Sequence, residues 1–244
     1  MRRRGEGRGL ATAAPQLQDN RVLAALPREA TERLLPYLEP VTLARGAILY
    51  APGQASAYLY FPTTTIVSLV YTMTDGTTAE IGLAGNEGVV GVARFLGGAT
   101  MPHWAIVRIA GGAFRLWAPA LQAEFQRGGA VQRALLRATQ ALLTQIAQMA
   151  VCNGVHPLAQ RLCRWLLCIH DRVPTAEIPI THEGLGQILA ARRESITLIA
   201  QHLQKAGVLG YHQGCLTILD RPGLEARVCE CYQVVQDECT RLLG

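Results

Sequence analysis

The sequence predicts an α+β protein in which a β-roll or jelly roll is followed by a long helix and a C-terminal winged helix-turn-helix. Three observations predict this order. Apolar residues alternate along most of residues 41–117, they recur every three or four residues from 130 to 151, and residues 180–219 read as helix, turn, helix and hairpin. We expect a basic tail, a β-roll, a dimerisation helix with a hinge, and a winged helix-turn-helix domain, at residues 1–18, 19–128, 129–154 and 155–244.

Composition limits the class of protein. Half of the 244 residues are hydrophobic, but no uncharged apolar run of about 18 residues demands a membrane span. The net charge is +5, of which residues 1–18 supply +3 through four arginines and one glutamate, a composition typical of a disordered tail. Residues 157–244 hold nine basic and nine acidic side chains. Bulk charge therefore gives no reason to expect nucleic-acid binding, and any phosphate attraction has to come from local placement.

The seven cysteines all lie at or after Cys152, and none forms a C-x-x-C pair. An odd count without paired spacing does not suit a secreted disulfide framework, so we expect a cytoplasmic protein. Cys229, Cys231 and Cys239 suggest a metal site at first sight. Residues i and i+2 of a helix point to different faces, however, so buried free thiols are the favoured interpretation. We expect no metal ion and no cofactor.

The segment from Val41 to Trp117 reads as short strands and Gly-rich turns. Asp75-Gly76 between apolar strands is a strong hairpin signal, and residues 105–109 and 113–117 make a second expected pair. Such strands indicate a sandwich or jelly roll, a fold that also hosts metal enzymes. His103 is the only histidine in this segment, and no hydrolase, metalloprotease or phosphate-loop signature is present. We therefore expect a protein that is not an enzyme.

Residues 130–151 predict one long helix with an apolar seam. The seam favours a coiled coil between two copies of the chain, because the paired second helices of two helix-turn-helix units need a two-fold axis; packing on the same chain's β-roll is the alternative. Leu136 and Leu143 form a second stripe that would then face the β-roll. Asn153-Gly154 reads as a hinge before Pro157. The dimer interface is predicted at Leu135, Leu142, Ile146 and Met149.

Residues 180–219 predict two helices at a steep angle followed by a hairpin, or wing. The second helix presents an outward face that suits a major groove, since arginine can donate two hydrogen bonds to guanine and a carboxylate accepts from the cytosine amino group. An amphipathic helical hairpin in any α-rich protein is the alternative. The wing and the Arg-Arg-Glu start favour duplex DNA as the partner. The predicted DNA-binding residues are Arg192, Arg193, Glu194, Ser195, Thr197, Leu198 and Gln201.

Three stretches resemble the cyclic-AMP-receptor/FNR (Crp/Fnr) family of bacterial transcription regulators: ITHEGLGQIL, RRES, and the wing with CLTILD. The resemblance implies a homodimer with a cyclic-nucleotide-binding-like β-roll, in which Arg193 and Glu194 read bases. A second arginine usually follows one turn later in the family, and here that position is Leu198. A leucine can contact a thymine methyl group but cannot bond guanine, so the resemblance implies an altered operator.

The family binds cyclic nucleotides through a Gly-Glu pair and an Arg-Ser-Ala-like triplet. The nearest stretches here are Gly88-Val89 and His103-Trp104-Ala105, in which both charged positions are lost. We therefore expect that cyclic AMP is not bound in the family's way. If the protein retains an effector pocket, its residues would be Gly88, Val89, His103 and Trp104.

The sequence thus predicts a homodimeric transcription regulator. The expected partners are double-stranded DNA, a second copy of the chain, RNA polymerase and an unidentified small-molecule effector, with no membrane. Two alternatives remain open. The first is a redox or metal-responsive regulator that uses the C-terminal cysteines, and the second is a DNA-binding scaffold without an effector.

Overall fold

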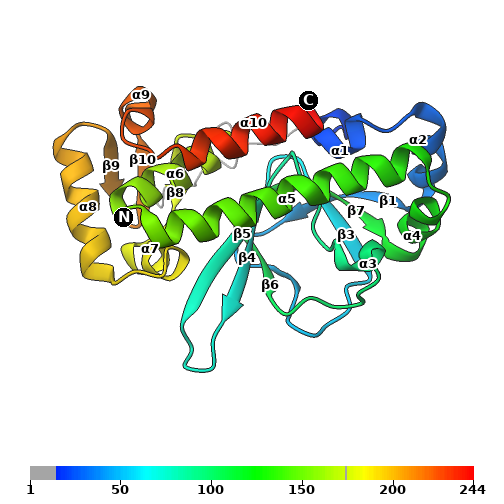
Figure 1. Ribbon diagram of the computed structural model, residues 1–244, viewed down its shortest axis with the longest axis horizontal. Coiled ribbons are helices and arrows are strands. Elements are labelled where there is room, and N and C mark those ends of the chain that lie inside the picture. The colour runs from blue at the N-terminus through cyan, green and yellow to red at the C-terminus, as the bar shows by residue number, and fades with distance from the viewer. Residues whose placement is uncertain (1–14, 174) are drawn as a thin grey trace, which may run out of the picture.

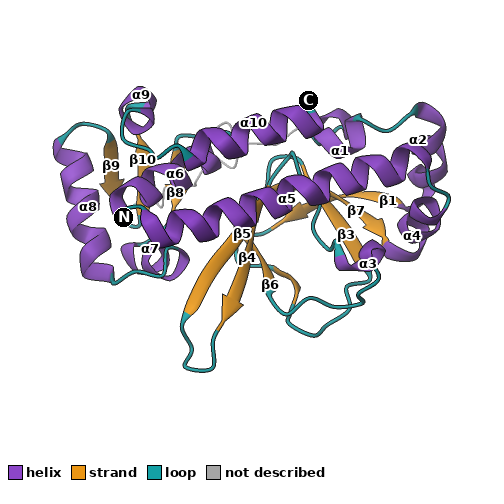
Figure 2. Ribbon diagram, in the orientation of Figure 1, coloured by secondary structure: helices purple, strands orange, loops and turns teal. Residues whose placement is uncertain are grey.

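The structure, a computed structural model, describes residues 15–173 and 175–244 and confirms the predicted order of β-roll, long helix and helix-turn-helix (Figure 1). Helices line one side and both ends of the molecule, and the strands of the β-roll lie beneath the long helix (Figure 2). Residues 1–14 of the predicted basic tail lie outside the described part. None of the described helices is long and apolar enough to cross a membrane.

Short helices precede the β-roll and pack on it. They are η1 (Leu17–Asp19), α1 (Arg21–Ala24), α2 (Arg28–Leu34) and η2 (Leu35–Tyr37). Asn20 is buried, and its Oδ1 caps α1 by accepting from the backbone N–H groups of Val22 and Leu23. Its Nδ2 donates to the carbonyl oxygens of Pro62 and Gly88 at 2.8 and 3.0 Å. One side chain therefore both starts the helix and fixes it to the β-roll.

Two antiparallel sheets form the β-roll. The three-stranded sheet has the order β1-β7-β3 and the four-stranded sheet has the order β2-β6-β4-β5. As expected, β4 and β5 form a hairpin around Asp75-Gly76, in which Thr72 pairs with Thr78. The strands are β1 (Leu38–Leu43), β2 (Ile48–Tyr50), β3 (Tyr58–Pro62), β4 (Ile66–Thr72), β5 (Thr78–Ala84), β6 (Trp104–Ile109) and β7 (Gly111–Trp117).

The expected pairing of residues 105–109 with 113–117 is wrong, because β6 and β7 belong to different sheets. Only Ala110 separates them, and the tightest common hairpin loop needs two residues to reverse the chain. The chain instead crosses from one sheet to the other at Gly111. A Cβ atom there would lie 2.5 Å from the Thr64 carbonyl oxygen, so the crossing needs a glycine.

The long helix α5 (Gly129–Val155) follows α3 (Ala93–Leu96) and α4 (Ala118–Gln126), and the structure reverses its two predicted faces. Leu135 is only 1% exposed and packs with Leu142 on the β-roll, and Met149 is also buried within the protomer. Ile146 is half-buried beside Gly82 of β5. Leu136 and Leu143, by contrast, are 45% and 61% exposed. The predicted dimer seam therefore packs inside the protomer, and the second stripe faces outward.

The bend after α5 falls later than the predicted hinge. Asn153 and Gly154 lie within the last turn of the helix, which ends at Val155. His156 is extended, with φ −101° and ψ 142°, because it precedes Pro157 and a residue before proline disfavours the helical region. The chain direction therefore changes at His156-Pro157.

The C-terminal domain contains the predicted helix-turn-helix and wing, and adds strand β8 to the hairpin in the order β8-β10-β9. The last helix, α10, leaves this domain and lies along α5, where Val235, Cys239 and Leu242 pack against Ala141 (Figure 1). The elements are α6 (Leu158–His170), β8 (Glu177–Pro179), α7 (His182–Ile188), α8 (Arg193–Lys205), β9 (Leu209–His212), β10 (Cys215–Ile218), α9 (Arg221–Glu225) and α10 (Cys231–Leu243).

Buried polar contacts join the two domains. Arg172, just after α6, donates from Nε to Oε1 of Glu87 at 2.7 Å, and both side chains are buried. Trp165 of α6 donates from Nε1 to Oε1 of Glu80 on β5 at 2.8 Å. Ile66, Leu83 and Ile109 of the β-roll belong to the same apolar cluster as the core of the C-terminal domain. The two domains therefore share one core.

Glu80 should make stability depend on pH. Burial is the main cause that raises its pKa above the ordinary value of 4.5, while Arg108 opposes the shift. The folded protein therefore holds this proton more tightly than the unfolded chain. The stabilisation is complete below the unfolded pKa and is lost as pH rises through the folded pKa. Glu80→Gln, which keeps an acceptor for Trp165, should be more stable relative to wild type at about pH 7.5 than at about pH 5.

Denaturant unfolding at the two pH values measures this difference. Glu29→Gln, which changes an exposed side chain of α2, is the control. Its free energy of unfolding should depend on pH as that of the wild type does. If the free energy of unfolding of Glu80→Gln depended on pH as that of the wild type does, the titration of Glu80 would not contribute to stability.

Candidate nucleic-acid interface

A tight turn sets the angle between α7 and α8. The Thr181 hydroxyl caps α7 by accepting from the Gly184 N–H at 3.0 Å, and Ala190 adopts a left-handed φ of 46° in the turn. The Ala191 N–H donates to the Gly186 carbonyl at 2.9 Å. A Cβ atom on Gly186 would lie 2.8 Å from the Ala191 carbonyl oxygen, so the helices can approach this closely only with glycine at 186.

The second helix, α8, buries one face and ends at a defined residue. Ile196, Ala200 and Leu203 form the buried stripe. Gly207 has a φ of 73°, its N–H donates to the Gln204 carbonyl, and the Val208 N–H donates to the Leu203 carbonyl. This double hydrogen bond is the Schellman motif, which a glycine just past a helix end favours. Both the register and the length of α8 are therefore set by its own sequence.

Helix α8 lies at the end of the molecule, away from the helices that pack on the β-roll (Figure 1). Arg192, Arg193, Glu194 and Gln201 are exposed, and Leu198 is 68% exposed. Within the described residues, the side chains of Arg192, Arg193 and Glu194 make no hydrogen bond or ion pair within the protein. These charged groups at the N-terminal end of α8 are free to contact another molecule.

Two of the predicted contact residues, Ser195 and Thr197, are only half-exposed. The Thr197 hydroxyl donates to the Arg193 carbonyl and lies 3.0 Å from Nδ1 of His182. Because the hydroxyl has one proton, His182 must donate from Nδ1 in this arrangement. Burial, followed by the charge of Arg193, lowers the pKa of His182, which fits a neutral ring. Thr197 is therefore placed to hold α7 against α8.

His182 also links the helix pair to the wing, a contact that the sequence analysis did not identify. Its ring stacks on Tyr211 of β9 with centroids 4.2 Å apart and an interplanar angle of 28°. Tyr211, His182 and Thr197 thus form a continuous chain from the wing through α7 to α8. No spacing pattern in the sequence links these three positions, since they meet only after the hairpin folds back.

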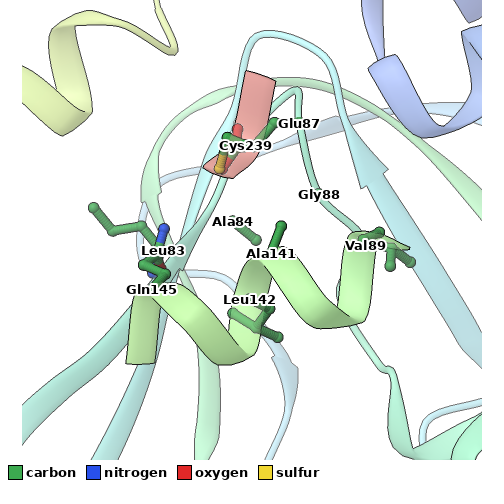
Figure 3. Close-up of a pocket in the computed structure, with 10 residues that line it drawn as sticks. Leu83, Ala84, Glu87, Gly88, Val89, Ala141, Leu142, Gln145 and Cys239 are labelled. Atoms are coloured by element: carbon green, nitrogen blue, oxygen red, sulfur yellow. The ribbon is translucent and has the colours of Figure 1, made fainter. Parts of the chain in front are cut away.

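The four residues predicted for an effector pocket do not share one. Gly88 and Val89 line a cavity between β5, α5 and α10 (Figure 3). Trp104 lines a separate pocket of about 380 Å³ between the four-stranded sheet and α7. His103 is buried, with Nε2 2.9 Å from the Tyr50 hydroxyl. The structure therefore does not bring the four residues into one pocket, because His103 packs on Tyr50 just before β6 while Trp104 begins that strand and lies on the other pocket.

The cavity beside Gly88 is small because the protein's own side chains fill it. Leu142 and Gln145 of α5 and Cys239 of α10 converge on it in Figure 3. Gln145 accepts at Oε1 from the Leu83 N–H at 2.7 Å. The remaining volume of about 20 Å³ has room for roughly one water molecule. In this arrangement a nucleotide would have to displace part of α5 and α10.

Comparisons with known proteins agree with this geometry. Residues 160–227 match the Crp-like helix-turn-helix domain. Among solved structures, a putative Crp/Fnr-family transcriptional regulator from Eubacterium rectale is 15% identical, with a TM-score of 0.68 over 86% of this chain and 98% of that one. FixK2 from Bradyrhizobium japonicum is 16% identical, with a TM-score of 0.67 over 79% of this chain and 98% of that one.

A Crp-family transcriptional regulator from Thermus thermophilus is 20% identical, with a TM-score of 0.62 over 84% of this chain and 98% of that one. No curated protein matches the chain by sequence. These likenesses extend well beyond the helix-turn-helix and include the β-roll and the long helix. Residues 160–227 are therefore a Crp-like helix-turn-helix domain, and the chain has the fold of the Crp/Fnr transcription regulators over most of its length.

Proposed function

We propose that this protein is a transcription regulator that binds duplex DNA sequence-specifically as a homodimer. The observation that carries the proposal is the exposed and unpaired Arg192-Arg193-Glu194 segment at the start of α8. This segment lies on a Crp-like helix-turn-helix, in which Gly186 allows the close approach of α7 and α8 and Gly207 ends α8. In this kind of docking, the N-terminal residues of the second helix reach base edges.

The exposed side chains of α8 suit different parts of the duplex. Arg193 can donate two hydrogen bonds to O6 and N7 of guanine, and Glu194 can accept from the amino group of cytosine. Arg192 precedes the first turn of α8 and is better placed for a phosphate, where the positive end of the helix dipole adds to its charge. Leu198 offers only apolar contact, which suits a thymine methyl group.

The outward face of α5 supports a dimer. Leu136, Leu143 and Ala150 are exposed and follow each other at intervals of seven residues, with Gln140 and Ala147 between them. This spacing of three and four is that of a two-stranded coiled coil, and the small residues near its end allow two helices to approach closely. The dimer contact is therefore proposed on this face instead of on Leu135, Leu142, Ile146 and Met149.

Leu143→Glu should convert the dimer to a monomer, since it would bring two like charges together in an apolar seam. Sedimentation equilibrium measures the change in mass. Leu35→Glu places the same charge on an exposed leucine of η2, outside the proposed seam, and should leave the mass unchanged. If Leu143→Glu were still dimeric, the dimer interface would have to lie on another face of the protein.

Selection of bound DNA from a random pool tests the function directly. A homodimer with two recognition helices should enrich a sequence with two-fold symmetry, whose half-sites lie about one helical turn apart. An excess of unrelated duplex removes binding that depends on phosphates alone. Failure to enrich any sequence would contradict the proposal, and enrichment of an asymmetric sequence would contradict the dimer.

A response to an effector is a separate part of the proposal. The pocket of about 380 Å³ between the sheet and α7 includes Glu80, Trp104 and Arg108, so it combines charge with an aromatic wall. A ligand there would contact both the β-roll and the helix-turn-helix. DNA affinity that stays constant across a screen of metabolites would favour a scaffold without an effector.

A further inference from the structure

Three cysteines and a histidine meet where α5 ends and α10 begins. Cys152 lies near the end of α5 and His156 follows its last residue, while Cys229 lies just before α10 and Cys231 is its first residue. The four ligand atoms all lie within 4.8 Å of one another. All the cysteines of the chain are free thiols, and these three are buried. This cluster lies outside the proposed DNA interface and outside both pockets described above.

The sequence argument against a metal site assumed that Cys229 and Cys231 share a helix. The structure shows that α10 begins at Cys231 and that Cys229 precedes it in non-helical backbone. The rule that residues i and i+2 point to different faces therefore does not apply to this pair. The other two ligands come from a helix about 75 residues earlier in the chain, which no local spacing could reveal.

The distances suit a single tetrahedral ion. Sγ of Cys152 lies 3.6 Å from Sγ of Cys229, and Sγ of Cys231 lies 3.4 Å from Nδ1 of His156. Zinc binds thiolate sulfur at ~2.3 Å and imidazole nitrogen at ~2.0 Å, so the edges of its tetrahedron are ~3.8 Å between two sulfurs and ~3.5 Å between sulfur and nitrogen. The cluster needs only small movements to reach these values.

Neighbouring side chains orient the candidate ligands as they do in zinc sites. Nδ1 of His156 faces the thiols, while its Nε2 lies 3.4 Å from Oε1 of Glu230. A carboxylate on the second ring nitrogen keeps the proton there and leaves the first nitrogen free for the ion. Nε2 of Gln148 donates to Sγ of Cys231 at 3.1 Å, which supports a thiolate.

The charge around the cluster also fits. Three thiolates, one neutral imidazole and one divalent cation sum to a net charge of −1. Arg164 is only 4% exposed, its Nε has no hydrogen-bond partner, and no carboxylate of the described residues lies within 4.0 Å of its guanidinium. Burial raises the pKa of the Cys152 thiol, and the nearby charge of Arg164 opposes that rise. A loaded site would add a counter-charge close to this buried cation.

We propose that Cys152, His156, Cys229 and Cys231 form a Cys₃His site for a zinc ion. Thiolate and imidazole ligands in tetrahedral arrangement select zinc over the hard cations, which prefer oxygen ligands. With four protein ligands the site is closed, which indicates a structural role. The ion ties the end of α5 to the start of α10 and so fixes the bend at His156-Pro157. This inference does not depend on the proposed DNA binding.

Metal analysis of the full-length protein, purified under reducing conditions and dialysed against metal-free buffer, tests the proposal. One zinc ion per protomer is expected. Titration of the metal-free protein with Co²⁺ should give the sulfur-to-metal charge-transfer absorption and the intense visible bands of tetrahedral cobalt, saturating at one equivalent. Cys229→Ser should lose stoichiometric binding. Cys215→Ser, on a half-buried cysteine of the wing, is the matched control and should keep it.

A second variant keeps the proposal testable if Cys229→Ser does not fold. Glu230 is exposed and touches His156 only through its carboxylate, so Glu230→Gln should fold normally and bind Co²⁺ about 10–100-fold more weakly. Less than one tenth of an equivalent of zinc, together with no charge-transfer absorption on adding Co²⁺, would overturn the proposal. So would tetrahedral cobalt bands that are unchanged in Cys229→Ser, since the ion would then be bound elsewhere.

Discussion

Replacing Glu87 by glutamine is expected to lower the free energy of unfolding by about 3–5 kcal/mol. Arg172 is buried between the domains, where its Nε donates to Glu87 at 2.7 Å and its Nη1 donates to the Cys168 carbonyl at 2.7 Å. The substitution keeps the shape of the side chain but removes its charge, so the guanidinium stays buried without a counter-ion. The cost arises from this unpaired cation more than from the lost attraction.

Urea unfolding of wild type and Glu87→Gln measures the loss. Glu32→Gln is the control, because the pair of Arg28 and Glu32 on α2 is exposed and should contribute less than about 1 kcal/mol. The double substitution Glu87→Gln with Arg172→Met removes both charges and should recover most of the stability. Equal losses of unfolding free energy in Glu87→Gln and Glu32→Gln would contradict the proposed cost of an unpaired buried cation. So would a double variant that is no more stable than Glu87→Gln.

Arg193→Ala is expected to reduce affinity for the selected operator by about 1–3 kcal/mol in each half-site if Arg193 makes a two-pronged guanine contact. A symmetric dimer carries the change twice, so the total loss is about 2–6 kcal/mol. The variant should fold normally, because Arg193 is exposed and its side chain makes no hydrogen bond or ion pair within the described residues. The preference for one base pair in each half-site should relax at the same time.

Fluorescence anisotropy with the operator and with single-base variants of it separates the two effects. Arg192→Ala, the neighbouring exposed arginine, is the matched control. It should weaken binding evenly across all sequences and make the affinity less dependent on salt, as the loss of a phosphate contact does. Unchanged sequence preference in Arg193→Ala would reject the role of Arg193 in base reading.

Features that depend on neighbouring residues could be predicted from the sequence. The hairpin at Asp75-Gly76, the end of α8 at Gly207 and the exposed Arg192-Arg193 segment all follow from local turn chemistry and from periodicity within one helix. The prediction of the helix-turn-helix was correct for the same reason. Its two helices meet through a turn of few residues, so their packing is set locally.

Features that depend on distant segments could not be predicted. Both stripes of α5 have similar spacing, and only the position of the β-roll decides that Leu135 is covered while Leu143 is exposed. His103 and Trp104 are neighbours in sequence, yet they face different surroundings. Cys152 meets Cys229 only because α10 returns along α5, and nothing near either cysteine encodes that return.

The shared core has a practical consequence for dissecting this protein. A fragment that begins at Pro157 would retain every strand and helix of the DNA-binding domain. It would nevertheless leave Trp165 without Glu80 and Arg172 without Glu87, and it would uncover the face of α10 that includes Val235 and Leu242. Such a fragment should be poorly soluble when expressed alone. Grafting its helix-turn-helix onto another scaffold would require redesign of the surfaces that the β-roll and α5 cover in the full chain.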